Sequence, residues 1–188
     1  MIEILAYGIC SVLWLGIVFL WLIPVIRKQI VYEIYAACGS GIMFSLLVLG
    51  NSIFERGHIL PLVYLGYAFC VLAAVFVIFS FLNLKHKGAP ESGWEQTTKL
   101  IEGGVYQIVR HPLYLGGALL TMGMILLLQS IPLMIFGFIA IFCFWAACKK
   151  EDEFNLKKFG DSYEIYMKKV PMWNFVKAMK NRWFRLME

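Results

Sequence analysis

The sequence is poor in charged residues. Asp, Glu, Lys and Arg make up 15% of its 188 residues, whereas soluble domains carry about 25%. The hydrophobic fraction is 61%, and a small soluble domain keeps too much of its surface in water to hide so much apolar area. The composition therefore argues against a soluble protein. The net charge of +5 is modest, so nucleic acid is not an expected partner.

Metal-binding and secretory patterns are also missing. The cysteines form no CxxC pair, lie in or beside apolar runs, and share no ligand spacing with the histidines, so we expect buried thiols and no metal site. Met1-Ile2-Glu3 has no basic segment of the kind that opens a signal peptide, so the first apolar run is predicted to be a retained span. The residues concerned are Cys10, Cys38, Cys70, Cys143, Cys148, His58, His86 and His111.

Five apolar runs approach the ~20 residues that cross a bilayer as a helix. Only Gln129-Ser130 separates the last two, and Pro132 suits a first helical turn. These two runs predict a tight helical hairpin; the alternative, one long buried helix, is disfavoured by the Gln-Ser-Ile-Pro sequence. The fold class expected is an all-α, polytopic membrane protein of about five transmembrane helices. The runs cover roughly residues 4–26, 34–54, 60–84, 113–128 and 131–147.

The basic residues predict the orientation. Every Lys and Arg except Arg56 follows the first, third or fifth run. Because such residues stay in the cytoplasm, the N-terminus is expected outside and the C-terminus inside. After the last run, residues 151–169 form a charged helical pattern. Residues 172–188 are amphipathic and predict an interfacial helix on the membrane, or alternatively a helix packed against the domain.

Two polar clusters flank the predicted hairpin. Arg110 and His111 precede Pro112, which can start a helix whose free N–H groups would seat a ligand carboxylate. Glu151 and Asp152 follow the fifth run, where acidic groups oppose the helix dipole and are costly near lipid unless paired or functional. A hairpin brings the clusters together. Taken separately, each could be no more than residues at the headgroup level or a solvated charged run.

Together the clusters resemble a known family. The segment from Gly104 to Gly116 resembles GxYxxVRHPxYxG, and the segment from Glu151 to Pro171 resembles EExxLxxxFGxxYxxYxxxVP. Both motifs belong to the superfamily of isoprenylcysteine carboxyl methyltransferases and phospholipid methyltransferases. The resemblance covers roughly residues 94–175. It implies one domain over 1–188, with a three-span half at 1–84 and a cofactor-binding half at 85–175.

The resemblance implies S-adenosylmethionine as cofactor and a lipophilic, membrane-embedded methyl acceptor. The acceptor would be a prenylcysteine-like carboxylate or another oxygen, nitrogen or sulfur nucleophile. Arg110, His111 and Glu151 are the implied catalytic residues. The implied cofactor-binding residues are Lys99, Leu100, Ile101, Tyr106, His111, Pro112, Leu113, Tyr114 and Glu151.

The chain departs from the family pattern at three places. Thr98 stands where relatives often have His, and Asp152 replaces a second Glu. Ala147 and Cys148 occupy the neighbourhood of an Arg that holds the substrate carboxylate in eukaryotic prenylcysteine enzymes, so the sequence does not predict a prenylcysteine carboxylate as the specific substrate. Two other functions remain open: an NADPH-dependent reductase of the sterol reductase type, for which the chain is short, and a non-catalytic membrane protein.

Overall fold

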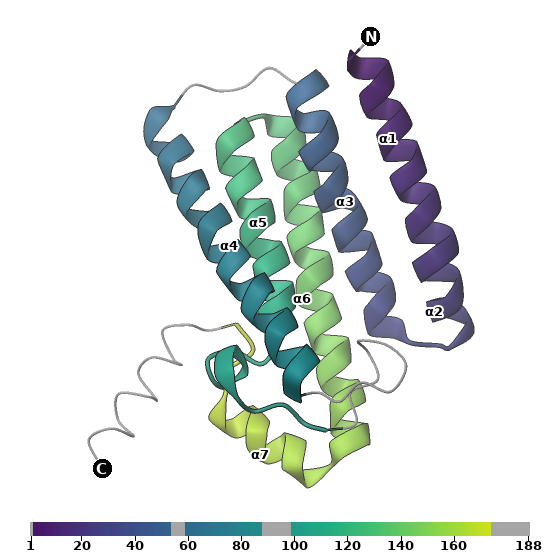
Figure 1. Ribbon diagram of the computed structural model, residues 1–188, viewed down its shortest axis with the longest axis vertical. Coiled ribbons are helices and arrows are strands. Elements are labelled where there is room, and N and C mark those ends of the chain that lie inside the picture. The colour runs from purple at the N-terminus through teal and green to yellow at the C-terminus, as the bar shows by residue number, and fades with distance from the viewer. Residues whose placement is uncertain (1, 54–58, 88–98, 174–188) are drawn as a thin grey trace.

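The computed structural model describes residues 2–53, 59–87 and 99–173. Within these residues every regular element is helical, which confirms the expected fold class (Figure 1). The predicted interfacial helix from residue 174 onward, the turn at 55–58 and Thr98 lie outside the described residues. The elements are α1 (Ile2–Gly16), η1 (Ile17–Leu22), α2 (Ile23–Arg27), α3 (Val31–Ile53), α4 (Leu60–Lys87), η2 (Gly104–Gln107), α5 (Pro112–Leu128), α6 (Ile131–Phe159) and α7 (Asp161–Lys169).

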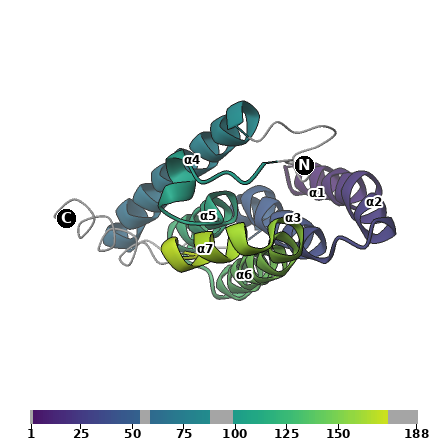
Figure 2. The ribbon, with the colours of Figure 1, turned by 90° about the horizontal axis from the view of Figure 1, so that it is seen from below.

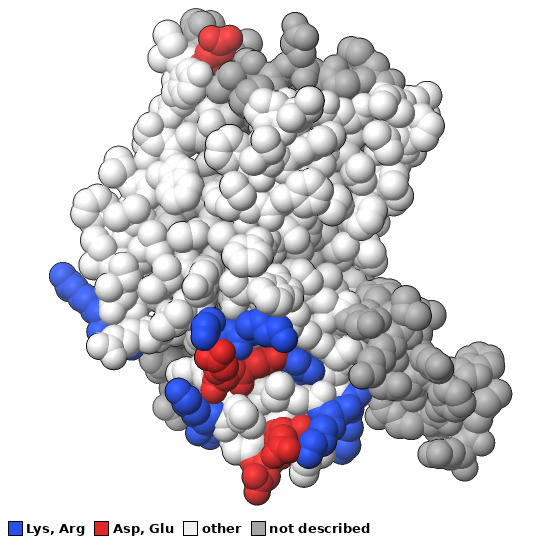
Figure 3. Space-filling model, turned by 180° about the vertical axis from the view of Figure 1, so that it is seen from behind, with Lys and Arg blue, Asp and Glu red and all other residues white. Residues whose placement is uncertain are grey.

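The surface of the helices suits lipid. Four described segments are long and apolar enough to cross a membrane, and α5 is a shorter apolar helix of 17 residues. Large apolar side chains such as Leu20 and Ile4 are 83% and 76% exposed, which is unfavourable in water and favourable in a bilayer. On the face seen in Figure 3, the charged side chains gather almost entirely around one end. The protein is therefore a polytopic membrane protein with a polar end.

The first span is a continuous helical rod with a local widening. The π-helical η1 joins α1 to α2 and ends at Leu22, two residues before Pro24. Proline has no N–H and its ring clashes with the carbonyl four residues earlier, and a wider turn at this place accommodates that misfit. The segment therefore keeps its spanning length despite the proline.

The predicted hairpin is present, formed by α5 and α6. Gln129 ends α5 in a left-handed conformation (φ 49°) and Pro132 lies in the first turn of α6. The Gln129 side chain also bonds to the backbone of Ile59, accepting from its N–H at 3.0 Å and donating to its oxygen at 3.1 Å. Around the hairpin, α4 packs on α5, α3 packs on α6, and α1 packs on α3 (Figures 1 and 2).

One prediction about the polar end is wrong. The sequence was expected to end the fifth span near Ala147 and to form a separate helical segment over 151–169. In the structure α6 continues without a break to Phe159, and the chain turns at Gly160 (φ 57°) into α7. No glycine or proline interrupts α6 between Gly137 and Gly160. Glu151 and Asp152 therefore lie inside a helix, and the unfavourable position at a helix end does not arise.

Close packing of α4 on α5 depends on small residues. A Cβ at Gly123 would lie 2.9 Å from the Gly66 backbone oxygen and 2.6 Å from Cys70 Sγ. We expect Gly123→Ala to destabilise the protein by about 1–3 kcal/mol, because backbone cannot move aside cheaply. Thermal unfolding in detergent measures the effect. Gly8→Ala is the control, since a Cβ there meets nothing within 4 Å; equal losses in both variants would contradict the close contact.

Candidate active site

A pocket opens at the polar end of the bundle. Its lining mixes apolar walls with a small number of polar and charged groups, which is typical of small-molecule sites. All nine residues predicted to bind the cofactor line it: Lys99, Leu100, Ile101, Tyr106, His111, Pro112, Leu113, Tyr114 and Glu151.

The start of α5 faces this pocket. Pro112 occupies the first turn, and the N-cap residue, His111, makes no side-chain hydrogen bond to the N–H groups of that turn. Leu113 and Tyr114, whose N–H groups belong to the first turn, line the cavity. The pocket therefore contains a helix N-terminus with its partial positive charge, which suits an anionic ligand group.

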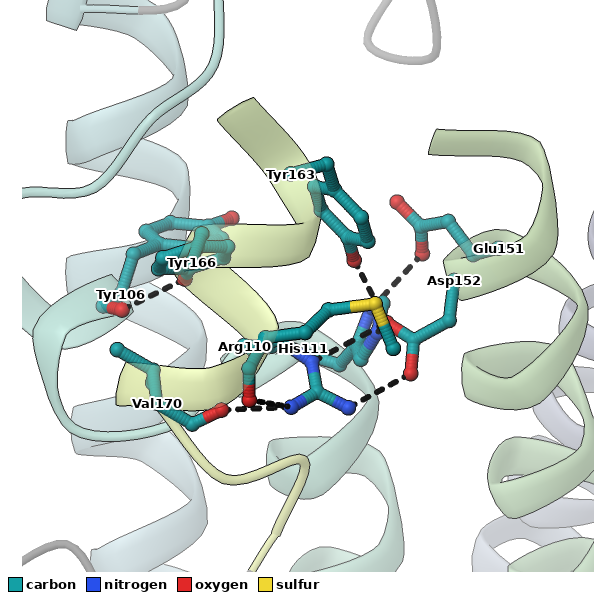
Figure 4. Close-up of polar contacts among 9 residues, drawn as sticks. Tyr106, Arg110, His111, Glu151, Asp152, Tyr163, Tyr166 and Val170 are labelled. Atoms are coloured by element: carbon teal, nitrogen blue, oxygen red, sulfur yellow. Dashed lines mark hydrogen bonds and ion pairs between the residues drawn. The ribbon is translucent and has the colours of Figure 1, made fainter. Parts of the chain in front are cut away.

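Asp152 is the centre of a buried polar network (Figure 4). Its carboxylate accepts hydrogen bonds from Arg110 Nη2 at 2.7 Å, from Arg110 Nε at 3.2 Å and from Tyr163 Oη at 2.6 Å. His111 Nε2 lies 2.7 Å from the same carboxylate. Burial and the Asp152 charge raise the pKa of Tyr163, which stays a neutral donor. Asp152 thus joins α5, α6 and α7 beneath the pocket.

The side chain of Arg110 donates its hydrogen bonds to other residues of the protein. Besides Asp152, its Nη1 donates to the carbonyl oxygens of Val170 at 2.6 Å and Met167 at 3.2 Å. Its backbone N–H donates to the Pro171 oxygen at 3.0 Å. The guanidinium therefore holds the end of α7 against the start of α5. We propose that Arg110 positions the pocket, in place of the catalytic role that the sequence suggested.

His111 lies between two carboxylates. It is 4% exposed, with Nδ1 3.2 Å from Glu151 Oε2 and Nε2 directed at Asp152. Burial lowers the pKa of His111, but the interactions with Glu151 and Asp152 outweigh that effect and raise it to about 9. His111 is therefore a cation near neutral pH, and its two N–H groups point at protein carboxylates and not at a ligand.

This shift predicts a pH-dependent stability. The pKa of His111 is raised from 6.5 to about 9 on folding, so its contribution is complete below about pH 6.5 and is lost as the pH rises through about 9. We expect the unfolding temperature of the wild type to exceed that of His111→Gln at pH 6, and the gap to close by pH 10. Thermal unfolding of both proteins across this range tests it, and parallel curves would contradict the charged state of His111.

Several lining residues were not predicted from the sequence. Tyr32 and Glu33 come from α3 and Leu84 from α4, so the pocket also draws on the first 84 residues. The sequence did contain one signal for these residues: Glu33 is an acidic residue at the start of an apolar helix, where a charge is costly unless it is paired or functional. The second motif contained the remaining lining residues without assigning them roles: Asn155, Phe159, Tyr163 and Tyr166.

No group of metal-ligating side chains occurs among the described residues. The pocket is thus built from a helix start, ionisable side chains and tyrosines.

The chain is similar in sequence to known methyltransferases. Residues 62–162 match the family described as Phospholipid methyltransferase. A protein-S-isoprenylcysteine O-methyltransferase of Schizosaccharomyces pombe is 36% identical over 73 residues, which cover 38% of this chain and 31% of that protein. No solved structure matches the chain. The family match spans more than half of the chain and includes the first motif and the start of the second, and the protein therefore belongs to the phospholipid methyltransferase family.

Proposed function

We propose that the protein transfers a methyl group from S-adenosylmethionine to a lipophilic acceptor that enters from the bilayer. The observation that supports this best is the pairing of the α5 N-terminus with Glu151 in one pocket. The helix N-terminus suits a ligand carboxylate, and Glu151 suits a positively charged group of the same ligand. S-adenosylmethionine has a carboxylate, an ammonium and a sulfonium, so the residues present fit it.

Different lining residues would bind different parts of the cofactor. The N–H groups of Leu113 and Tyr114 would receive the carboxylate. Glu151, with 27% of its side chain exposed, would receive a cationic group. Tyr106 and Tyr114 offer ring faces to an adenine or a sulfonium. Leu100, Ile101 and Pro112 supply apolar wall, and Lys99 lies at the exposed edge.

The cofactor, when bound, supplies an electrophilic methyl group on a sulfonium. The protein's contribution is to align the acceptor with that group and to exclude water. A carboxylate acceptor needs no base, whereas an amine, phenol or thiol must lose a proton. Glu151 is the better candidate base, because His111 already holds its proton at neutral pH.

Titration of the purified full-length protein with S-adenosylmethionine and, separately, with NADPH tests the proposal. Calorimetry in neutral detergent should show binding of S-adenosylmethionine alone, and incubation with membrane lipids should transfer its labelled methyl group to a lipid. Binding of NADPH in its place would support the reductase, and binding of neither would support a non-catalytic protein. Either result would refute the proposed methyltransferase activity.

We also propose that the pocket faces the cytoplasm. Lys and Arg follow the first, third and fifth runs. The helix α2, which ends at Arg27, lies at the same end of the bundle as α7 (Figure 1), and Lys149 and Lys150 directly precede Glu151, which lines the pocket. In a variant without native cysteines, Lys168→Cys at the end of α7 should resist a membrane-impermeant maleimide in intact cells. Ile59→Cys, at the opposite end, should react. The reverse pattern would overturn the orientation.

A further inference from the structure

One side of α6 changes from apolar to basic within two helical turns. Ala140 and Phe144 on the inner side of this helix are buried, whereas Phe142 and Trp145 on the opposite side are 60% and 40% exposed. Lys149, one turn beyond Trp145, is also exposed. The spacing of three and then four residues places Phe142, Trp145 and Lys149 on one face of the helix. We refer to these three side chains as the outer column of α6, because they face away from the protein.

The side chains of the outer column contact one another. The rings of Phe142 and Trp145 are stacked, with centroids 5.7 Å apart and planes at 30°. Lys149 Nζ lies 5.7 Å from the centre of the Trp145 ring, which is within the range of a cation–π interaction. None of the three residues lines the pocket. The ammonium group is therefore held beside an aromatic surface on the outside of the bundle.

The position of Lys149 along α6 coincides with the edge of a bilayer. From Ile131, at the start of the helix, to Lys149 the helix rises about 27 Å, and the hydrocarbon core of a bilayer is about 30 Å thick. Tryptophan rings and lysine ammonium groups are typical of that boundary. On the face seen in Figure 3, the Lys and Arg side chains begin where a wide uncharged surface ends. Lys149 therefore lies at the level of the phospholipid headgroups.

Lys149 has no carboxylate partner within the described part of the chain. The acidic residue one turn further along α6, Glu153, pairs with Lys150, whose Nζ lies 2.9 Å from each of its two carboxylate oxygens. An ammonium group at the headgroup level that lacks a counter-ion in the protein is complementary to a lipid of net negative charge. A zwitterionic lipid matches it less well, because its own cation balances the phosphate.

We propose that the outer column of α6 binds an anionic phospholipid at a site separate from the pocket. Lys149 pairs with the headgroup phosphate, and the rings of Phe142 and Trp145 pack against the glycerol backbone and the upper part of the acyl chains. Glu151, which lines the pocket, follows Lys149 by two residues and points about 200° away from it around the helix. The lipid therefore lies outside the bundle while the pocket lies inside, and its binding does not depend on the proposed methyl transfer.

Binding of short-chain lipids to the full-length protein tests the proposal. Dioctanoylphosphatidylglycerol and dioctanoylphosphatidylcholine have the same tails and differ in headgroup charge, and their dissociation constants can be measured by thermophoresis in neutral detergent. The wild type should bind the anionic lipid at least about fivefold more tightly, which corresponds to the attraction of one lysine to an anionic lipid surface. Glycerol 3-phosphate, which has a phosphate and no acyl chains, should show no saturable binding.

Three variants separate the contributions. Lys149→Gln should bring the two lipids within about twofold of each other and leave the affinity for S-adenosylmethionine unchanged. Trp145→Leu keeps the surface apolar but removes the ring, so it should weaken binding of both lipids by about threefold and keep the preference. Lys168→Gln is the matched control, because it removes the same charge from α7, where Lys168 is exposed and paired with Glu164 at 2.7 Å. It should keep the wild-type preference.

Several results would overturn the proposal. The wild type could fail to distinguish the two lipids, or the preference could survive in Lys149→Gln. An equal loss of preference in Lys168→Gln would assign the effect to net charge and not to the outer column. Glycerol 3-phosphate that bound as tightly as the anionic lipid would indicate a site for free phosphate, and a loss of S-adenosylmethionine affinity in Lys149→Gln would show that Lys149 acts on the pocket.

Discussion

Replacing Asp152 with Asn should lower the thermal unfolding temperature by roughly 6–20 °C, the equivalent of about 3–5 kcal/mol for a chain of this size. Asp152 is 6% exposed. Its carboxylate accepts hydrogen bonds from both Arg110 and Tyr163, and His111 Nε2 lies 2.7 Å away. Asparagine keeps the shape but removes the charge. Two buried cations would then lose their common partner, which is the costly way to break a buried ion pair.

Thermal unfolding of purified Asp152→Asn in detergent measures this loss. Glu153→Gln is the control on the same helix, because Glu153 is exposed and its pairing with Lys150 contributes little. An unfolding temperature for Asp152→Asn equal to that of the control would show that the network does not stabilise the fold. Cofactor affinity of the folded fraction should fall less in Asp152→Asn than in Glu151→Gln, since Asp152 does not line the pocket.

Glu151→Gln should weaken S-adenosylmethionine binding by roughly 10- to 150-fold, because one hydrogen bond to a charged ligand group is worth about 1.5–3 kcal/mol. Glu151 lines the cavity and its side chain is 27% exposed, so its removal costs the fold less than the loss of Asp152. His111→Ala should also weaken binding, by releasing Glu151 from the imidazole 3.2 Å away. His111 acts here through Glu151 and not by direct contact with the carboxylate of the ligand.

Calorimetry on each purified, monodisperse variant measures these affinities, with Glu153→Gln as the control that should bind like the wild type. Unfolding temperatures are recorded in parallel, so a weakened fold is not read as a weakened site. Near-wild-type affinity and turnover in both Glu151→Gln and His111→Ala would refute the assignment of the site.

The sequence predicted the parts of this protein that depend on local pattern. Apolar runs of spanning length located the membrane helices, and Gln129 with Pro132 marked the hairpin turn. Once the hairpin was recognised, its geometry required the segment around His111 to lie near Glu151. The nine residues that the family resemblance implied all line the pocket. These features follow from helical periodicity, turn residues and motif spacing, which are properties of neighbouring positions in the chain.

Only the tertiary structure decided which side chains meet in the site. Successive helical residues point about 100° apart, so the rotation of α6 directs Glu151 into the pocket and Asp152 beneath it. That rotation depends on how α6 packs against α3 and α5. The same packing lets Arg110 donate a hydrogen bond to a backbone carbonyl just after α7, and it places His111 between two carboxylates. It also brings Glu33 to the pocket. No local pattern encodes these contacts, because each joins segments whose relative position is set by the packing of whole helices.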